Sequence, residues 1–127
     1  MIKGLEHIAL YTKNAKALAD WYVKYLETKI VVDTGNGVYF IAFSDGSMLE
    51  IVENSKEENV PTPLETPGIR HLAITVEDFE AAEAKIREAK TEILQEPQVA
   101  PNGAKTMFFR DLDGNILHFI KRPKPLV

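Results

Sequence analysis

The sequence predicts an α+β protein made of two βαβββ modules, because a chain of 127 residues repeats one pattern of motifs. Residues 4–10, Gly-Leu-Glu-His-Ile-Ala-Leu, match residues 68–74, Gly-Ile-Arg-His-Leu-Ala-Ile. Residues 45–51 match residues 113–119, with Asp-Gly at the start of each. Each copy also has the same order of strand-like alternation and helix-like spacing of apolar residues. The repeat therefore indicates one structural unit that occurs twice.

The first copy is expected to hold a strand, a helix and three further strands. Residues 5–12 alternate and are rich in residues that favour strands. Asn14 is an N-cap candidate, and apolar residues follow it at helical spacing. They include the aromatic residues Trp21, Tyr22 and Tyr25, which we expect in the core. Asn-Gly and Asp-Gly steps between the later strands are typical of hairpins. The predicted elements are a strand at 5–12, a helix at 15–26, and strands at 29–33, 38–43 and 48–53.

The second copy is expected to repeat this order. Asp78 is an N-cap candidate in front of an alanine-rich helical segment. Residues 111–115 begin like a calcium-binding loop, but no Glu follows at the required spacing, so we expect a turn. The predicted elements are a strand at 70–76, a helix at 79–90, and strands at 92–95, 105–110 and 115–121.

A polar, acidic stretch with three prolines separates the copies. Such a composition favours an exposed and fairly stiff connector. We therefore expect a single domain, residues 1–127, in which modules at 1–54 and 68–127 are joined by a linker at 55–67. This linker is long enough for the modules to meet within one chain or to be exchanged between two chains. We expect a homodimer, because each small module has apolar strand edges and faces to cover.

Composition and charge exclude several classes of partner. Hydrophobic residues make up 45% of the chain, which is enough for a compact core. The net charge of −4 gives no reason to expect nucleic acid or an anionic membrane as a partner. The chain has no cysteine, so disulfides and thiolate ligands are excluded. It shows neither a transmembrane segment nor signal-peptide features, so we expect a cytoplasmic protein.

All three histidines fall at positions that the repeat relates to one another. His7 and His71 share one position, and Glu50 and His118 share another. A single histidine in a strand is usually a packing residue, but three at equivalent positions favour a site for a divalent transition metal. We expect one ion near the pseudo-two-fold axis of the repeat. Its predicted ligands are His7, Glu50, His71 and His118.

Two-residue alternation places these four side chains on one face of the predicted sheets. His7 shares a face with Ala9, and His71 shares a face with Ala73. The two ligands on the last strands take the corresponding face, which points away from the helices. The small alanines beside the histidines leave room for a bound molecule.

Several motifs make the sequence resemble the vicinal oxygen chelate superfamily, which includes glyoxalase I, extradiol dioxygenases, fosfomycin resistance proteins and bleomycin-binding proteins. The motifs are Glu-His-Ile-Ala-Leu at 6–10, Trp-Tyr-Val-Lys-Tyr-Leu at 21–26, Arg-His-Leu-Ala-Ile-Thr-Val at 70–76 and Phe-Arg-Asp-Leu-Asp-Gly-Asn-Ile-Leu-His at 109–118. The resemblance implies two βαβββ modules whose mixed sheet curls around a metal-binding cleft, with the helices on the outer face. It also implies the same four ligand positions as the repeat.

The chain departs from this family at informative positions. The last ligand position most often holds Glu in the family, and here it holds His118. Glyoxalase I uses two carboxylates at its metal, whereas only Glu50 is available here. An Arg that binds glutathione in glyoxalase I is replaced by Tyr11, although Asn54 matches a glutathione-contacting Asn. These departures weigh against lactoylglutathione lyase more than against a metal enzyme.

The donor set and the resemblance together imply a metal-dependent lyase, isomerase or dioxygenase. Four protein ligands around a six-coordinate ion leave two sites for a small molecule that carries oxygens on neighbouring carbons. Glu50 is the expected ligand and base, with His118 as a further ligand or the alternative base. Three imidazoles favour Zn²⁺, Ni²⁺, Co²⁺ or Fe²⁺ over Mg²⁺ or Ca²⁺.

Two other functions within the same family remain open. A metal-free binding protein of the bleomycin-resistance type sequesters its ligand without turnover, but it has no reason to keep His and Glu at all four positions. A metal-dependent transferase of the fosfomycin-resistance type has the same fold and opens an epoxide with a metal ion bound in the same way. Arg70 and Arg110, at strand ends, are candidates for contact with an anionic substrate, although such residues are usually solvated.

Overall fold

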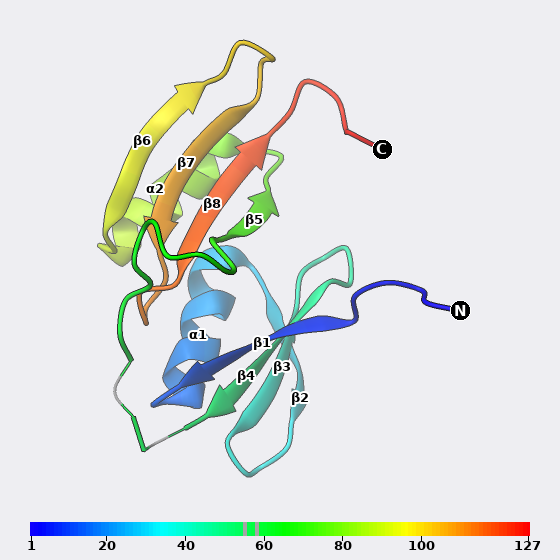
Figure 1. Ribbon diagram of the computed structural model, residues 1–127, viewed down its shortest axis with the longest axis vertical. Helices are drawn as coiled ribbons and strands as arrows, with labels where there is room; N and C mark the ends of the chain where they lie inside the picture. Colours follow the sequence, from blue (N-terminus) through cyan, green and yellow to red (C-terminus); the bar gives the residue numbers. More distant parts are fainter. Residues whose placement is uncertain (55, 58) are drawn as a thin grey trace. The chain divides into compact units, whose positions relative to one another are not determined.

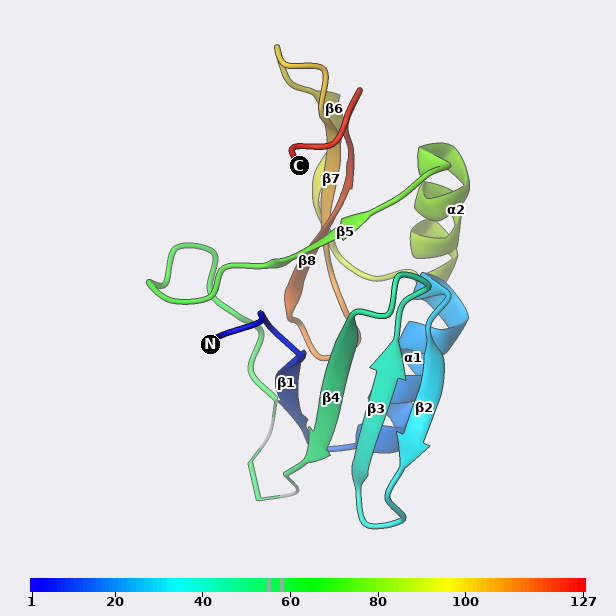
Figure 2. The same cartoon turned by 90° about the vertical axis from the view of Figure 1, so that its right-hand side faces the viewer.

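The computed structural model describes residues 1–54, 56–57 and 59–127. The chain forms two compact units, Met1–Asn59 and Val60–Val127, which we call module 1 and module 2. Each contains a four-stranded mixed sheet and one helix. Figure 1 and Figure 2 show that the helix of each module lies on one face of that module's sheet. The predicted α+β class with two βαβββ modules is therefore confirmed.

Module 1 has the predicted order of elements. Its strands lie in the order β1-β4-β3-β2, with β1 parallel to β4 and the other neighbours antiparallel. The parallel pair brings the first and last strands of the module together. The elements are β1 (His7–Thr12), α1 (Ala15–Leu26), β2 (Lys29–Asp33), β3 (Val38–Ala42) and β4 (Met48–Glu53).

Module 2 repeats this topology. Its strands lie in the order β5-β8-β7-β6, and β5 is parallel to β8. The first and last strands are again neighbours. The elements are β5 (Leu72–Thr75), α2 (Phe79–Ala89), β6 (Ile93–Val99), β7 (Lys105–Arg110) and β8 (Ile116–Lys121).

Both helices begin at the predicted caps and bury one face. The side chain of Asn14 accepts a hydrogen bond from the backbone N–H of Ala17, and that of Asp78 accepts one from Ala81. These bonds satisfy N–H groups that the start of a helix leaves without a partner. The buried helix residues include Leu18, Trp21, Tyr22, Phe79 and Ile86. Trp21 and Tyr22 are thus confirmed as core residues, whereas Tyr25 is only partly buried.

Three strand boundaries differ from the predictions by two residues or more. β1 begins at His7 rather than residue 5, because its first residue pairs with Met48, where β4 begins. β5 begins at Leu72 rather than residue 70, where its pairing with β8 starts. β6 continues to Val99 rather than ending at residue 95. It includes Pro97, which an edge strand with register shifts accommodates because the proline nitrogen has no hydrogen to donate.

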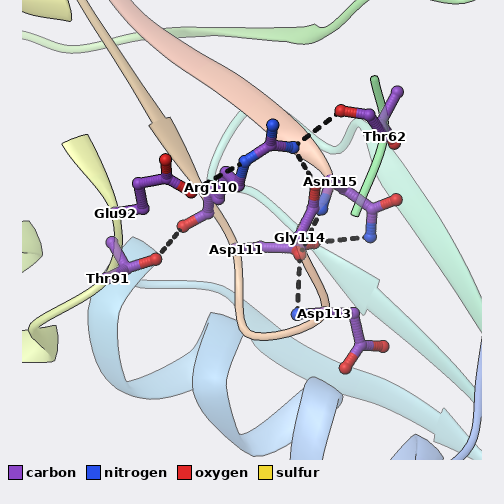
Figure 3. A network of polar contacts seen from close by, with 8 residues as sticks. All are labelled: Thr62, Thr91, Glu92, Arg110, Asp111, Asp113, Gly114 and Asn115. Atoms are coloured by element: carbon purple, nitrogen blue, oxygen red, sulfur yellow. Dashed lines mark hydrogen bonds and ion pairs between the residues drawn. The ribbon is translucent and has the colours of Figure 1, made fainter. Parts of the chain in front are cut away.

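The turn between β7 and β8 is built around a buried aspartate, as Figure 3 shows. Asp111 is 3% exposed, and its Oδ1 accepts hydrogen bonds from the backbone N–H groups of Asp113 and Asn115. Its Oδ2 accepts another from the side-chain amide of Asn115, at 2.8 Å. An aspartate that bonds to its own turn in this way fixes the local backbone. The segment is therefore a turn, as predicted.

Arg110 ties neighbouring segments of module 2 to this turn (Figure 3). Its guanidinium donates to the carbonyl oxygens of Thr62 and Gly114 and to the carboxylate of Glu92. A Cβ at Gly114 would lie 2.7 Å from Cα of Pro61, so the chain before β5 packs closely on the turn. These contacts occupy Arg110 and argue against the substrate contact considered from the sequence.

The predicted linker at 55–67 is described in part, because residues 55 and 58 lie outside the described residues. Its boundaries stay a prediction. In the part of the chain that the structure describes, no helix is long and apolar enough to cross a membrane.

We predict that Asp111→Ala lowers the free energy of unfolding by about 2–4 kcal/mol, because several donors at a buried turn lose their acceptor. Urea denaturation followed by circular dichroism measures this change. Asp45→Ala is the matched control, because Asp45 accepts from Ser47 in an exposed hairpin of module 1. Its loss is expected to cost less than about 1 kcal/mol. Equal losses in the two variants would contradict the role assigned to Asp111.

Candidate metal centre

In module 1, strand pairing places Glu50 on β4 between Ala9 on β1 and Phe40 on β3. His7, two residues before Ala9, points to the same face because side chains alternate along a strand. Its ring meets Phe40 edge-on, with ring centroids 5.3 Å apart. Both neighbours of Glu50 along β4 are buried, whereas Glu50 is only partly covered. His7 and Glu50 therefore share the more open face of the module 1 sheet.

The geometry of His7 and Glu50 fits a shared metal ion. Nε2 of His7 lies 3.7 Å from Oε1 of Glu50. Nδ1 of His7 lies 3.0 Å from Oε1 of Glu6, and because a carboxylate only accepts, Nδ1 carries the proton. Nε2 of the neutral ring then offers its lone pair. Two ligand atoms, each about 2.1 Å from one ion, lie roughly 3.0–3.6 Å apart. The side chains of His7 and Glu50 therefore need to move little to bind the same ion.

In module 2, the same pairing places His118 on β8 between Ala73 on β5 and Phe108 on β7. The centroid of the His71 ring lies 4.3 Å from that of His118 and 5.3 Å from that of Phe108. His118 is 8% exposed, and its Nδ1 has no hydrogen-bond partner among the described residues. Buried polar atoms nearly always have a hydrogen-bond partner, so a nitrogen without one is unusual. Nδ1 of His118 is therefore available to a ligand from outside the chain.

The residue before each site histidine differs between the modules and affects its ring in opposite ways. Arg70 donates from Nη1 to Nδ1 of His71 at 3.1 Å, whereas Glu6 accepts from His7. Arg70 also lies over the ring of Phe108, with Cζ 5.0 Å from the centroid. In this arrangement the neutral His71 ring carries its proton on Nε2. A metal held through Nε2 requires that proton on Nδ1 instead.

Burial lowers the pKa of both histidines in module 2. The pKa of His71 lies below its usual value, first because the ring is partly buried and then because Arg70 is positively charged. The pKa of His118 falls to about 4, mainly through burial, with further effects of the charges on His71, Arg70 and Arg122. Both rings are therefore neutral at pH 7, which is the form that binds a metal.

The structure brings the four predicted ligands together as two pairs, His7 with Glu50 and His71 with His118. Each pair lies at the corresponding place of its own module. Among the residues that the structure describes, no group of three or more His, Asp or Glu side chains has metal-binding geometry. A single site made by all four residues stays a prediction.

Sequence reasoning missed three residues that shape these pairs. Phe40 and Phe108 contact the first histidine of their modules in the same edge-on way. Both lie opposite the last-strand ligand, so a strand-by-strand comparison of the two copies offered a signal for them. Glu6 was not identified as the partner of His7, because it lies just before β1, where a side chain has no fixed direction in a sequence pattern.

The chain is similar to known proteins over almost its whole length. The family model described as the Glyoxalase/Bleomycin resistance protein/Dioxygenase superfamily matches residues 4–119. Metallothiol transferase FosB from Staphylococcus haemolyticus is 29% identical over 119 residues, which cover 92% of this chain and 82% of FosB.

Solved structures share the fold. A glyoxylase/bleomycin resistance protein/dioxygenase domain from Frankia sp. EAN1pec has a TM-score of 0.80 at 21% identity, covering 98% of this chain and 95% of that one. Another solved structure is a mutant of the fosfomycin resistance protein FosX from Listeria monocytogenes, in complex with Mn(II) and 1S,2S-dihydroxypropylphosphonic acid. It has a TM-score of 0.77 at 18% identity, covering 99% of this chain and 94% of that one. Since the family model spans residues 4–119, this chain belongs to the Glyoxalase/Bleomycin resistance protein/Dioxygenase superfamily.

Proposed function

We propose that this protein is a divalent-metal-dependent enzyme, a cytoplasmic homodimer that acts on a small molecule with oxygens on neighbouring carbons. The four ligands of the two pairs hold one ion, either within one chain or between two chains. The observation that supports this most directly is a ligand pair at the corresponding place in both modules. A metal-free binding protein has no need of such donors in each module.

The donor set favours a transition metal. Three imidazoles and one carboxylate suit Zn²⁺, Ni²⁺, Co²⁺ or Fe²⁺, whereas Mg²⁺ and Ca²⁺ prefer oxygen ligands. The Mn(II) in the FosX structure shows that a protein of this fold can hold a divalent ion. When bound, such an ion supplies a Lewis acid that stabilises negative charge on a substrate oxygen.

Glu50 is the proposed general base. It is the only carboxylate among the four residues, and it is only partly covered on the open face of its sheet. A carboxylate so placed is suited to accept the proton from a C–H next to a substrate carbonyl. His118 is buried, and its ring lies close to His71 and Phe108, so a substrate has less access to it. We therefore assign His118 a role as ligand, and as base only if Glu50 proves dispensable.

The similarity to FosB favours a second candidate function, the metal-dependent transfer of a thiol to a small epoxide. FosB carries the name metallothiol transferase and matches 92% of this chain. Assays of the metal-loaded protein separate the two functions. Thiol-dependent loss of an epoxide phosphonate supports the transferase, whereas conversion of a hemithioacetal, a catechol or an acyl-CoA ester supports a lyase, dioxygenase or isomerase.

We predict that His7→Ala and His71→Ala each abolish stoichiometric metal binding at pH 7, because each variant removes one of two donors in its module. Metal content after dialysis against Zn²⁺ is measured by inductively coupled plasma mass spectrometry. Glu6→Gln still accepts from the ring of His7, so it is expected to weaken binding only about 10-fold. Full metal content in both alanine variants would rule out the site.

Glu50→Gln is expected to separate metal binding from turnover. The amide keeps the size and one oxygen donor, so part of the metal stays bound, but it no longer accepts a proton. Turnover should fall about 10²–10⁴-fold if Glu50 is the general base. Glu88→Gln, at an exposed position of α2, is the matched control and should leave turnover unchanged. Undiminished turnover of Glu50→Gln with full metal would transfer the role of base to His118.

The metal-free protein is expected to lose stability as the pH falls from about 6.5 to about 4, in part because of His118. In this range the unfolded chain takes up a proton on His118 while the folded chain does not, so acid favours unfolding. His118→Phe removes this contribution and should flatten the pH dependence of the free energy of unfolding. Urea denaturation of both proteins across this range measures the difference. Carboxylates also titrate in this range, but the two proteins have the same ones, so the difference between the profiles reports on His118. Identical pH profiles would contradict the lowered pKa.

A further inference from the structure

A hollow of about 260 Å³ lies in module 2, close to the His71–His118 pair. Phe108 links the two, because its ring lines the hollow and lies 5.3 Å from the His71 ring and 4.5 Å from the His118 ring. Apolar side chains and charged or polar side chains both line this hollow, and such a mixed lining suits a substrate that carries a polar group. The lining residues that matter here are Glu65, Arg70, Leu94, Gln95, Phe108 and Ile116.

Arg70 lies between this hollow and the metal-binding pair. Its guanidinium stacks on Phe108 and donates to Nδ1 of His71. No carboxylate of the described residues forms an ion pair with it. When Nε2 of His71 is a metal ligand, Nδ1 carries a proton and no longer accepts from Arg70. The donors of Arg70 are then free for a group in the hollow.

Gln95 contributes a second polar group with unused hydrogen-bonding capacity. It pairs with Phe108 across the β6–β7 ladder, on the opposite side of Phe108 from His118. Its Oε1 is buried and has no hydrogen-bond partner among the described residues. A side-chain amide offers both donors and an acceptor, so a ligand with oxygen atoms satisfies it.

The described residues of module 1 contain no counterpart of this arrangement. The residue before its site histidine is the negatively charged Glu6 rather than an arginine. Val32 takes the place of Gln95, since it pairs with Phe40 as Gln95 pairs with Phe108. The charge distribution therefore favours an anionic group at module 2 and disfavours one at module 1.

We propose that Arg70 and Gln95 bind an anionic group, a carboxylate or a phosphonate, of a substrate whose neighbouring oxygens reach the metal. This inference rests on the proposed metal site and names the substrate class. A guanidinium forms two parallel charge-assisted hydrogen bonds to such a group, and the amide of Gln95 adds a further donor. The carboxylate of Glu65 lies in the same hollow and opposes the anion, so its removal should strengthen binding.

Two chelating probes test this proposal: catechol, which is neutral, and 3,4-dihydroxybenzoate, which adds a carboxylate to the same ring. Binding to the Co²⁺-loaded protein is followed by the visible absorption of the ion. We expect the wild-type protein to bind 3,4-dihydroxybenzoate about 10–100-fold more tightly than catechol. Arg70→Gln should remove this preference without changing the affinity for Co²⁺, and Arg70→Lys should keep part of it. Glu65→Gln, the charge control, should increase it.

The outcomes separate two kinds of failure. The role of Arg70 is wrong, while the metal site stands, if the wild-type protein does not prefer the probe with the carboxylate. The same conclusion follows if Arg70→Gln keeps the preference or weakens the binding of both probes equally. If the wild-type protein binds no Co²⁺, the proposed function is wrong and this inference falls with it. Titration of Co²⁺ into each variant before the probes are added distinguishes these cases.

Discussion

Parallel pairing of the first and last strands is the constraint on which the site in each module depends. The pairing sets Ala9 beside Glu50 and Ala73 beside His118. The histidine at the start of β1, or just before β5, therefore lies near a proposed ligand on the last strand of its module. Side chains alternate along a strand, and a register shift of one residue would therefore turn Glu50 toward the face that α1 covers. The helices, hairpins and buried residues hold this register. The buried Asp111 turn does so in module 2 by fixing where β8 begins.

The repeat duplicates the framework of the site but not its charges. Both modules place a phenylalanine against the site histidine and a small alanine beside the last-strand ligand. The polar residues around this framework differ. Module 1 carries the carboxylates of Glu6 and Glu50 and so suits proton transfer, whereas module 2 carries the guanidinium of Arg70 and so suits the binding of negative charge. At three equivalent positions the residue in module 1 differs from that in module 2: Glu6 and Arg70, Val32 and Gln95, and Glu50 and His118.

Most of the fold was predictable from the sequence because it is set by local signals. The caps at Asn14 and Asp78 and the Asp-Gly turns act within a few residues, and the structure confirms them. The end of β6 was not predictable, because Pro97 fits a strand only when register shifts and an open edge allow it. The four expected ligand positions followed from the repeat, and their sharing of one ion stays a prediction. The contact of Arg70 with His71 depends on a side-chain direction that periodicity does not determine.

The central claim is that two half-sites, one in each module, hold a single ion. X-ray absorption spectroscopy of the protein with one equivalent of bound Zn²⁺ or Co²⁺ tests it most directly, because scattering from imidazole rings gives the number of histidine ligands. The account predicts one ion per chain with three imidazoles and one carboxylate, at nitrogen and oxygen distances of about 2.0–2.2 Å. A bound ion with no more than two imidazoles would contradict it, because the account requires all three histidines on one ion.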